Sequence, residues 1–206
     1  MEKYLHKIWD SLTIRSKISI EYSEELFKKI LDKYNGKKRH YHNLTHIYNM
    51  CLSFEKHKDN IDRKDDILYA IFFHDIIYRA ISKNNELNSA IFMKKYLSDH
   101  LSDNSINFIY DAILSTKEHL LNENSDINYL LDLDVEILGQ EWDTYNNYRK
   151  NIRKEFSIYP NFMYNKGRLD ALSGFIDYNI FKNDEFIELY EYSSLENIKK
   201  EIELIN

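Results

Sequence analysis

The chain has 206 residues, with 28 basic and 34 acidic side chains and a net charge of −6. This balance gives no strong signal for nucleic-acid binding, and no apolar run approaches the roughly 18 residues of a membrane span. A single cysteine excludes an internal disulfide, and the first residues lack the apolar core of a signal peptide, so a cytoplasmic location is expected.

Turn-forming residues are scarce in this chain, which has only four glycines and one proline. Sheets and hairpins need such residues, whereas long helices do not. No internal repeat, low-complexity tract or clear linker interrupts the sequence. It therefore predicts an all-α protein that folds as a single compact helical bundle over residues 1–206.

Apolar residues at helical spacing predict the individual helices. The first helix is expected at residues 3–14. The second begins at a cap, Ser19 or Ser23, and stops at Gly36. The third covers 44–57 behind an Asn43 cap, and the fourth covers 64–78. A fifth helix follows the loop 82–85, with Leu87, Ala90, Ile91 and Leu97 among its inner residues. The remaining helices are expected at about 104–116, at 126–138 before Gly139, at about 141–158 and 161–180 on either side of Pro160, and in an acidic segment at the end.

Two stretches place carboxylates among apolar residues. His74 and Asp75 interrupt the most apolar part of the chain, residues 72–78, and Asp134 lies among leucines. A buried charge is costly unless it is paired or binds a metal. With His46, these residues offer two imidazoles and two carboxylates, a set that suits octahedral Mn²⁺, Fe²⁺, Co²⁺, Ni²⁺ or Mg²⁺. Taken alone, the His-Asp pair also fits a core histidine near a helix end.

The order of these residues is similar to a known family signature. His46, then Phe73-His74-Asp75, then Asp132-Leu133-Asp134 before Gly139 resemble the H…HD…D pattern of HD-domain phosphohydrolases, and in particular a bacterial subgroup of predicted metal-dependent members of about this length. The similarity covers roughly residues 37–180 and includes Arg39-His40-Tyr41-His42, Asn85-Glu86, Ser89-Ala90, Thr116, His119, Tyr145, Tyr148, Ile152-Arg153 and Glu155. It implies an HD core at about 37–140 with the helices of 141–206 packed on it.

The resemblance also implies roles for individual residues. The metal ligands would be His46, His74, Asp75 and Asp134. Asp132 competes for the last position, but two residues on a helix diverge by about 200°, so only one of the two carboxylates can face the ion.

Auxiliary roles follow from the same resemblance, each beside a simpler interpretation. Glu86 and Asp75 are the predicted catalytic residues, although a helix N-terminus also favours Glu86. Predicted phosphate or substrate contacts are Arg39, His42, His119 and Arg153. Their simpler interpretations are a solvated basic loop for Arg39, a surface loop for His42, a helix end for His119 and surface ion pairs for Arg153.

The implied activity is hydrolysis of a phosphate ester or anhydride by metal-activated water. The expected partner is a small phosphate compound, with a nucleotide as the substrate class, and no membrane. One alternative is a di-iron HD-type oxygenase that uses His42 and His119 as extra ligands. Another is a non-catalytic helical module that binds metal or nucleotide. The sequence leaves open whether the chain forms a homodimer.

Overall fold

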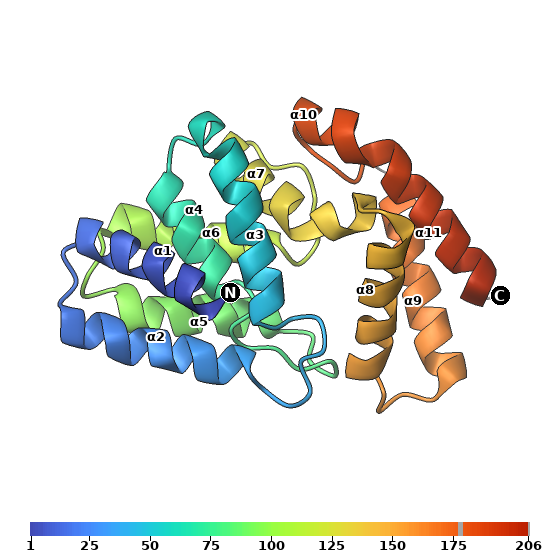
Figure 1. The fold of residues 1–206 in the computed structure, drawn as a ribbon, viewed down its shortest axis with the longest axis horizontal. Coiled ribbons are helices and arrows are strands. Elements are labelled where there is room, and N and C mark those ends of the chain that lie inside the picture. Colours follow the sequence, from blue (N-terminus) through green and yellow to red (C-terminus); the bar gives the residue numbers. More distant parts are fainter. Residues whose placement is uncertain (177–178, 206) are drawn as a thin grey trace. The chain divides into compact units, whose positions relative to one another are not determined.

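The computed structural model describes residues 1–176 and 179–205, and this part of the chain contains helices and turns but no β-strand (Figure 1). The predicted all-α class is confirmed. By internal contacts the chain divides into two compact units, Met1–Leu120 and Leu121–Asn206. Among the described residues, no helix combines the length and apolarity needed to cross a bilayer.

The first unit contains six α-helices and one short 3₁₀ helix among its residues. They are α1 (Glu2–Arg15), α2 (Ile20–Tyr34), α3 (Leu44–His57), η1 (Lys58–Asn60), α4 (Lys64–Phe73), α5 (Asn85–Leu97) and α6 (Asp103–Ser115). Sequence prediction located each α-helix of this unit, and two caps agree in detail. The Ser19 hydroxyl accepts from the backbone N–H of Tyr22, and the Asn43 side chain accepts from that of Thr45.

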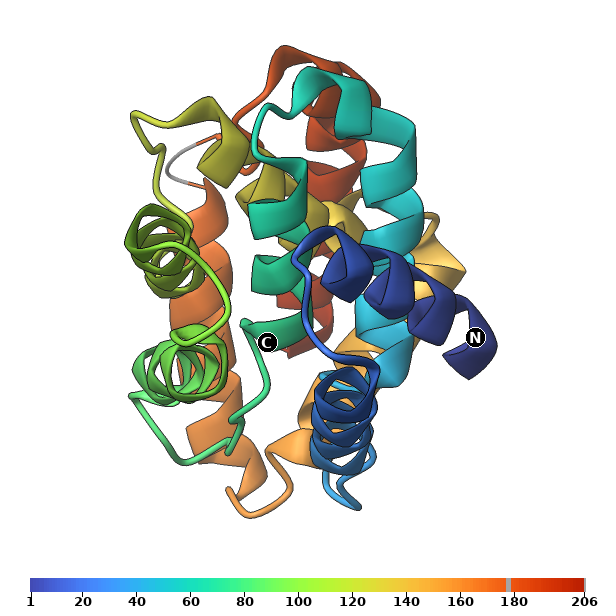
Figure 2. The ribbon, with the colours of Figure 1, turned by 90° about the vertical axis from the view of Figure 1, so that its left-hand side faces the viewer.

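Helix α4 forms the core of the first unit. Every residue from Ile67 to Phe73 is buried, so beyond its charged first turn the helix has no solvent-exposed face. Figure 2 shows α4 between α1 and α3 on one side and α5 and α6 on the other. The Trp9 ring of α1 lies 5.2 Å from the ring of Phe72, and its indole N–H donates to the carbonyl of Ser23. Buried aromatic contacts of this kind stabilise a core beyond their area alone.

Two predictions for this unit are wrong in detail. Helix α4 ends at Phe73 rather than at residue 78, and His74 forms its C-cap. On α5, the predicted inner residues Leu87 and Ile91 are 39% and 52% exposed. The predicted Ala90 and Leu97 are buried on that helix, together with Met93 and the polar Asn85 and Ser89.

The second unit contains the remaining elements. They are α7 (Ser125–Val135), η2 (Glu136–Gly139), α8 (Trp142–Glu155), α9 (Asn161–Ile176), α10 (Asp184–Phe186), the π-helical η3 (Ile187–Glu191) and α11 (Tyr192–Ile205). The predicted helix at 126–138 thus ends earlier and continues as a 3₁₀ turn. The predicted helix at 161–180 is found as α9 up to Ile176; its residues 177 and 178 lie outside the described part, and residues 179 and 180 are not helical.

A buried polar cluster joins three helices of the second unit. Glu201 of α11 is 1% exposed. It accepts two hydrogen bonds from the Arg168 guanidinium of α9, at 2.9 and 3.0 Å, and one from the Tyr145 hydroxyl of α8. Because a buried carboxylate is costly without partners, these bonds satisfy Glu201 and set the packing of the three helices.

Candidate metal centre

His46 comes from the first turn of α3. The Asn43 cap starts the helix three residues earlier, so His46 already has helical geometry and its side chain points into the first unit. The residue is 4% exposed. Because the helix starts at Leu44, the predicted ligand occupies a rigid position, whereas His42 lies in the preceding loop.

His74 and Asp75 lie where α4 gives way to a turn. The N–H of His74 still donates to the carbonyl of Ala70, which is the last helical bond, and the N–H of Ile76 donates to the carbonyl of Phe73. The two side chains are therefore presented at the C-terminal end of the buried helix. His74 is 1% exposed and Asp75 is 9% exposed.

The structure brings three of the four predicted ligands together within the first unit. One ligand atom from each of His46, His74 and Asp75 lies within 4.8 Å of the other two. The two Nε2 atoms of the histidines are 3.2 Å apart, and Nε2 of His74 is 3.5 Å from Oδ2 of Asp75. Atoms that share one ion at about 2.1 Å are separated by roughly 3.0–3.5 Å at neighbouring positions of a tetrahedron or octahedron. The donor set fits a divalent ion.

The ring orientation of His74 also fits metal binding. Its Nδ1 lies 3.0 Å from the carbonyl oxygen of Ile71, which can only accept, so Nδ1 carries the proton. In the neutral ring, Nε2 therefore keeps its lone pair and directs it toward His46 and Asp75. Metal-bound histidines usually donate their other ring N–H to a carbonyl or carboxylate in this way.

His42 borders the carboxylate of Asp75 and is itself held by Tyr78. Nε2 of His42 lies 3.9 Å from Oδ2 of Asp75. The His42 ring stacks on Tyr78, with centroids 4.1 Å apart and planes at 26°. The stacking holds the imidazole at the edge of the cluster, and 20% of its side chain remains accessible to solvent. His42 can thus contact both the cluster and a small molecule from solvent.

The two candidate carboxylates of α7 belong to the second unit and have different surroundings. Asp132 is fully buried, and its oxygens accept from the backbone N–H groups of Lys182 and Asn183 and from the Asn183 amide, at 2.7–2.8 Å. Burial raises the pKa of the Asp132 carboxyl to about 6, although these hydrogen bonds act in the opposite direction. Asp134 is half-buried, and its role as a metal ligand stays a prediction.

Glu86 and His119 lie at helix ends of the first unit. Glu86 is half-buried in the first turn of α5. His119 follows α6 with a left-handed backbone, φ 49°, and its N–H donates to the carbonyl of Ser115. Neither belongs to the His46–His74–Asp75 cluster. Their catalytic and substrate roles stay predictions.

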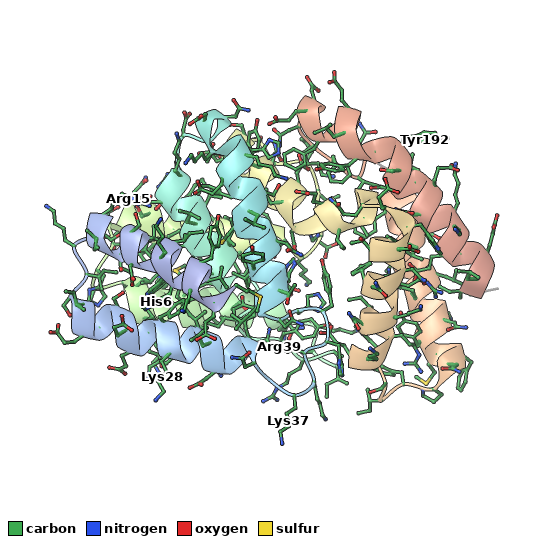
Figure 3. The ribbon with its side chains drawn as sticks, in the orientation of Figure 1. His6, Arg15, Lys28, Lys37, Arg39 and Tyr192 are labelled. Carbon is green, nitrogen blue, oxygen red and sulfur yellow. The ribbon has the colours of Figure 1, made fainter. Side chains whose placement is uncertain are left out.

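The two predicted phosphate-binding arginines donate to backbone carbonyls. Arg39, in the loop between α2 and α3 (Figure 3), donates to the carbonyls of His42, Asp75 and Ile76. Arg153, in the second unit, donates to the carbonyls of Phe156 and Tyr159 and to the Asn161 side chain. Phosphate contact by either arginine stays a prediction.

Sequence reasoning gave no role to two buried polar residues of α5, although both lie in matched stretches of the resemblance. The Ser89 hydroxyl accepts from the N–H of Ile77, and the Asn85 amide bonds both the N–H and the carbonyl of Arg79. The available signal was their polarity on the same helical face as Ala90 and Met93. Both residues hold the chain that follows Asp75.

Comparisons of the chain with protein-family models, curated proteins and solved structures found no match. The functional assignment therefore depends on the chemistry of the cluster and on the sequence pattern.

Proposed function

We propose that the protein is a metal-dependent phosphohydrolase that acts on a phosphate ester or anhydride, with nucleotides as the substrate class. The observation that carries the proposal is the buried cluster of His46, His74 and Asp75, whose ligand atoms lie within 4.8 Å of one another. The order of these residues in the chain, followed by the predicted fourth ligand Asp134, is the sequence pattern that supports the HD-type assignment. Membership of that family is part of the proposal.

A divalent ion at this cluster would polarise a phosphoryl oxygen and lower the pKa of a bound water. The chain's own residues would orient the ligands, bind the phosphate and move protons. The hydrogen bond of His74 to the Ile71 carbonyl fixes the ring so that Nε2 of the neutral imidazole faces His46 and Asp75. His42, held against Tyr78, contacts the phosphate of a bound substrate or donates a proton to the leaving group. Glu86 acts as the general base, a role taken from the sequence pattern.

The experiment that tests the proposal removes individual ligands. Protein treated with a chelator is titrated with Mn²⁺, Fe²⁺, Co²⁺, Ni²⁺ or Mg²⁺, and phosphate release is followed over a panel of nucleotides and small phosphoesters. His74→Gln and Asp75→Asn should each weaken metal binding by more than about 100-fold, because they remove ligands rather than outer contacts. Hydrolysis should fall with metal content.

Two exposed residues of the first unit provide matched controls. His40→Ala and Asp111→Ala change the same residue types outside the cluster and should leave metal content and hydrolysis at the wild-type level. Full metal stoichiometry in His74→Gln or Asp75→Asn, with native circular dichroism, would refute the ligand assignment. Metal binding without hydrolysis of any phosphate compound would favour the non-catalytic binding module.

The di-iron oxygenase is the second candidate because His42 approaches the same Asp75 oxygen as His74, at 3.9 Å against 3.5 Å. It requires two irons per chain. Iron analysis and Mössbauer spectroscopy of protein purified without oxygen distinguish it from a mononuclear hydrolase. One metal per chain with phosphate release would exclude the oxygenase.

A further inference from the structure

The chain immediately after the His-Asp pair has no regular secondary structure, yet distant side chains satisfy its backbone. Residues 75–79 lie between α4 and the loop before α5. The carbonyls of Asp75 and Ile76 accept from Arg39, at 2.7 and 2.9 Å. Ser89 bonds the backbone of Ile77. These bonds, with those of Asn85 to Arg79, replace the helical bonds that end at Phe73.

Arg39 makes the bonds nearest the cluster. Its Nη1 donates to the carbonyls of both His42 and Asp75, and its Nη2 donates to the carbonyl of Ile76. One guanidinium therefore joins the loop before His46 to the backbone of the predicted ligand Asp75. The central carbon lies 4.9 Å from the ring centre of Tyr34 and 5.6 Å from that of Tyr78.

A lysine could not make the same set of contacts. Its ammonium is a single point donor, whereas the guanidinium donates from two terminal nitrogens in a fixed plane and stacks on aromatic rings. The Tyr78 ring that faces Arg39 also stacks on His42, so the guanidinium contacts the ring that holds His42 at the edge of the cluster. All three of these Arg39 hydrogen bonds go to backbone carbonyls of the protein itself.

We infer that Arg39 is a positioning residue of the candidate metal centre: it holds the backbone of Asp75 and the adjacent His42 loop so that the Asp75 carboxylate stays beside His46 and His74. The inference rests on the proposed metal-binding function. It assigns to Arg39 an effect on metal affinity, whereas a phosphate ligand would affect the KM of the substrate. The two roles therefore predict different results for the same variants.

The test compares Arg39→Lys and Arg39→Ala with Lys38→Ala, which removes a charge from an exposed residue of the same loop. Mn²⁺ affinity is measured by calorimetry on chelator-treated protein, and KM for the phosphate substrate is measured at saturating Mn²⁺. Hydrogen exchange of the amides of residues 76, 77 and 79 is followed without metal. Both Arg39 variants should bind Mn²⁺ about 10- to 100-fold more weakly, the range for residues that support ligands.

KM at saturating Mn²⁺ should remain within about twofold of the wild type. Exchange of the three amides without metal should be faster, because the carbonyls of Asp75 and Ile76 have lost the Arg39 donor. Lys38→Ala should match the wild type in all three measurements. Unchanged Mn²⁺ affinity and unchanged exchange in the Arg39 variants would overturn the inference, and a raised KM in that case would assign Arg39 to phosphate.

The outcomes separate this inference from the proposed function. If the wild type binds no Mn²⁺ or other divalent ion, the proposed function fails. The effect of Arg39 on metal affinity then fails with it, and the exchange rates of the metal-free proteins test what remains: faster exchange in both Arg39 variants shows that Arg39 holds residues 75–79, and wild-type rates overturn that as well.

Discussion

Asp132 and Asp134 show how far two neighbouring carboxylates of one helix can differ. Asp132 is 0% exposed, and its oxygens bind the chain at Lys182 and Asn183. It thereby attaches the segment after α9 to α7 within the second unit. Asp134 points elsewhere, because two residues on a helix are rotated by about 200°. The backbone role of Asp132 leaves Asp134 as the better candidate for a metal ligand.

Substitution of each aspartate by asparagine should separate these roles. Asp134→Asn should remove most of the bound metal, whereas Asp132→Asn should retain it and lower the free energy of unfolding by about 1–3 kcal/mol, because a buried N–H loses its acceptor. Elemental analysis and urea unfolding of the two purified variants measure both effects. Loss of metal in Asp132→Asn but not in Asp134→Asn would reverse the assignment.

The raised pKa of Asp132 adds a pH dependence to the same comparison. Between its usual pKa of 3.8 and about 6, the folded protein holds a proton on Asp132 that the unfolded chain releases. The contribution of Asp132 to the free energy of unfolding therefore falls as pH rises through this interval. Asparagine has no such proton, so the stability advantage of wild type over Asp132→Asn should be larger at pH 4 than at pH 6.5.

The arginines illustrate what residue identity alone cannot predict. A guanidinium in a basic loop fits either a phosphate or a set of carbonyls, since both offer oxygen acceptors. The sequence located Arg39 beside the cluster. It could not show that the carbonyls of Asp75 and Ile76 would be free of helical bonds, because that depends on where α4 ends.

At the scale of the elements, periodicity located the helices well and their ends less well. Caps such as Asn43 are encoded locally, and the predicted start of α3 is confirmed. The end of α4 is not encoded locally, because the apolar pattern continues through Ile76 and Ile77. Partners far along the chain, Arg39 and Ser89, bind the backbone that would otherwise continue the helix. The same tertiary demand explains why polar residues of α5 are buried.

Gly139, at the end of η2, permits a close approach of two elements in the second unit. A Cβ added there would lie 2.5 Å from Cβ of Tyr190 and 3.0 Å from its Cα. Gly139→Ala should therefore destabilise the protein by about 1–3 kcal/mol, because backbone must move. Thermal unfolding measures the change.

Gly174 of α9 is the matched control, since an added Cβ would meet nothing within 4 Å. Gly174→Ala should stabilise the helix by up to about 1 kcal/mol. Equal melting temperatures for the two alanine variants would contradict the packing argument for Gly139.

At the scale of the whole molecule, the division at Leu120 and Leu121 had no signal in the sequence. No glycine- or proline-rich linker marks it, and the HD-type pattern continues across it to Asp134. Periodicity reports which residues are buried but not which of them share a core. The fold class was thus predictable, whereas the grouping of helices into units required three-dimensional contacts.

The buried cluster of Glu201, Arg168 and Tyr145 lies entirely in the second unit, so its loss should affect that unit. Glu201→Gln leaves the Arg168 charge without its carboxylate and should cost about 3–5 kcal/mol. Hydrogen exchange should accelerate in α8, α9 and α11 and remain unchanged in α1 to α6. Glu203→Gln, at an exposed position of α11, is the control. Uniform acceleration over both units would show that they unfold as one.

The hydrogen bonds that hold residues 75–79 have a consequence for how readily the cluster could acquire a different chemistry. Arg39, Ser89 and Asn85 bind carbonyls and amides, and every residue type except proline has both. The bonds that fix the path of the chain at position 75 therefore do not involve the side chain there. A histidine, glutamate or asparagine substituted for Asp75 would start from the same Cα, so that selection or design can exchange the donor group without rebuilding the scaffold.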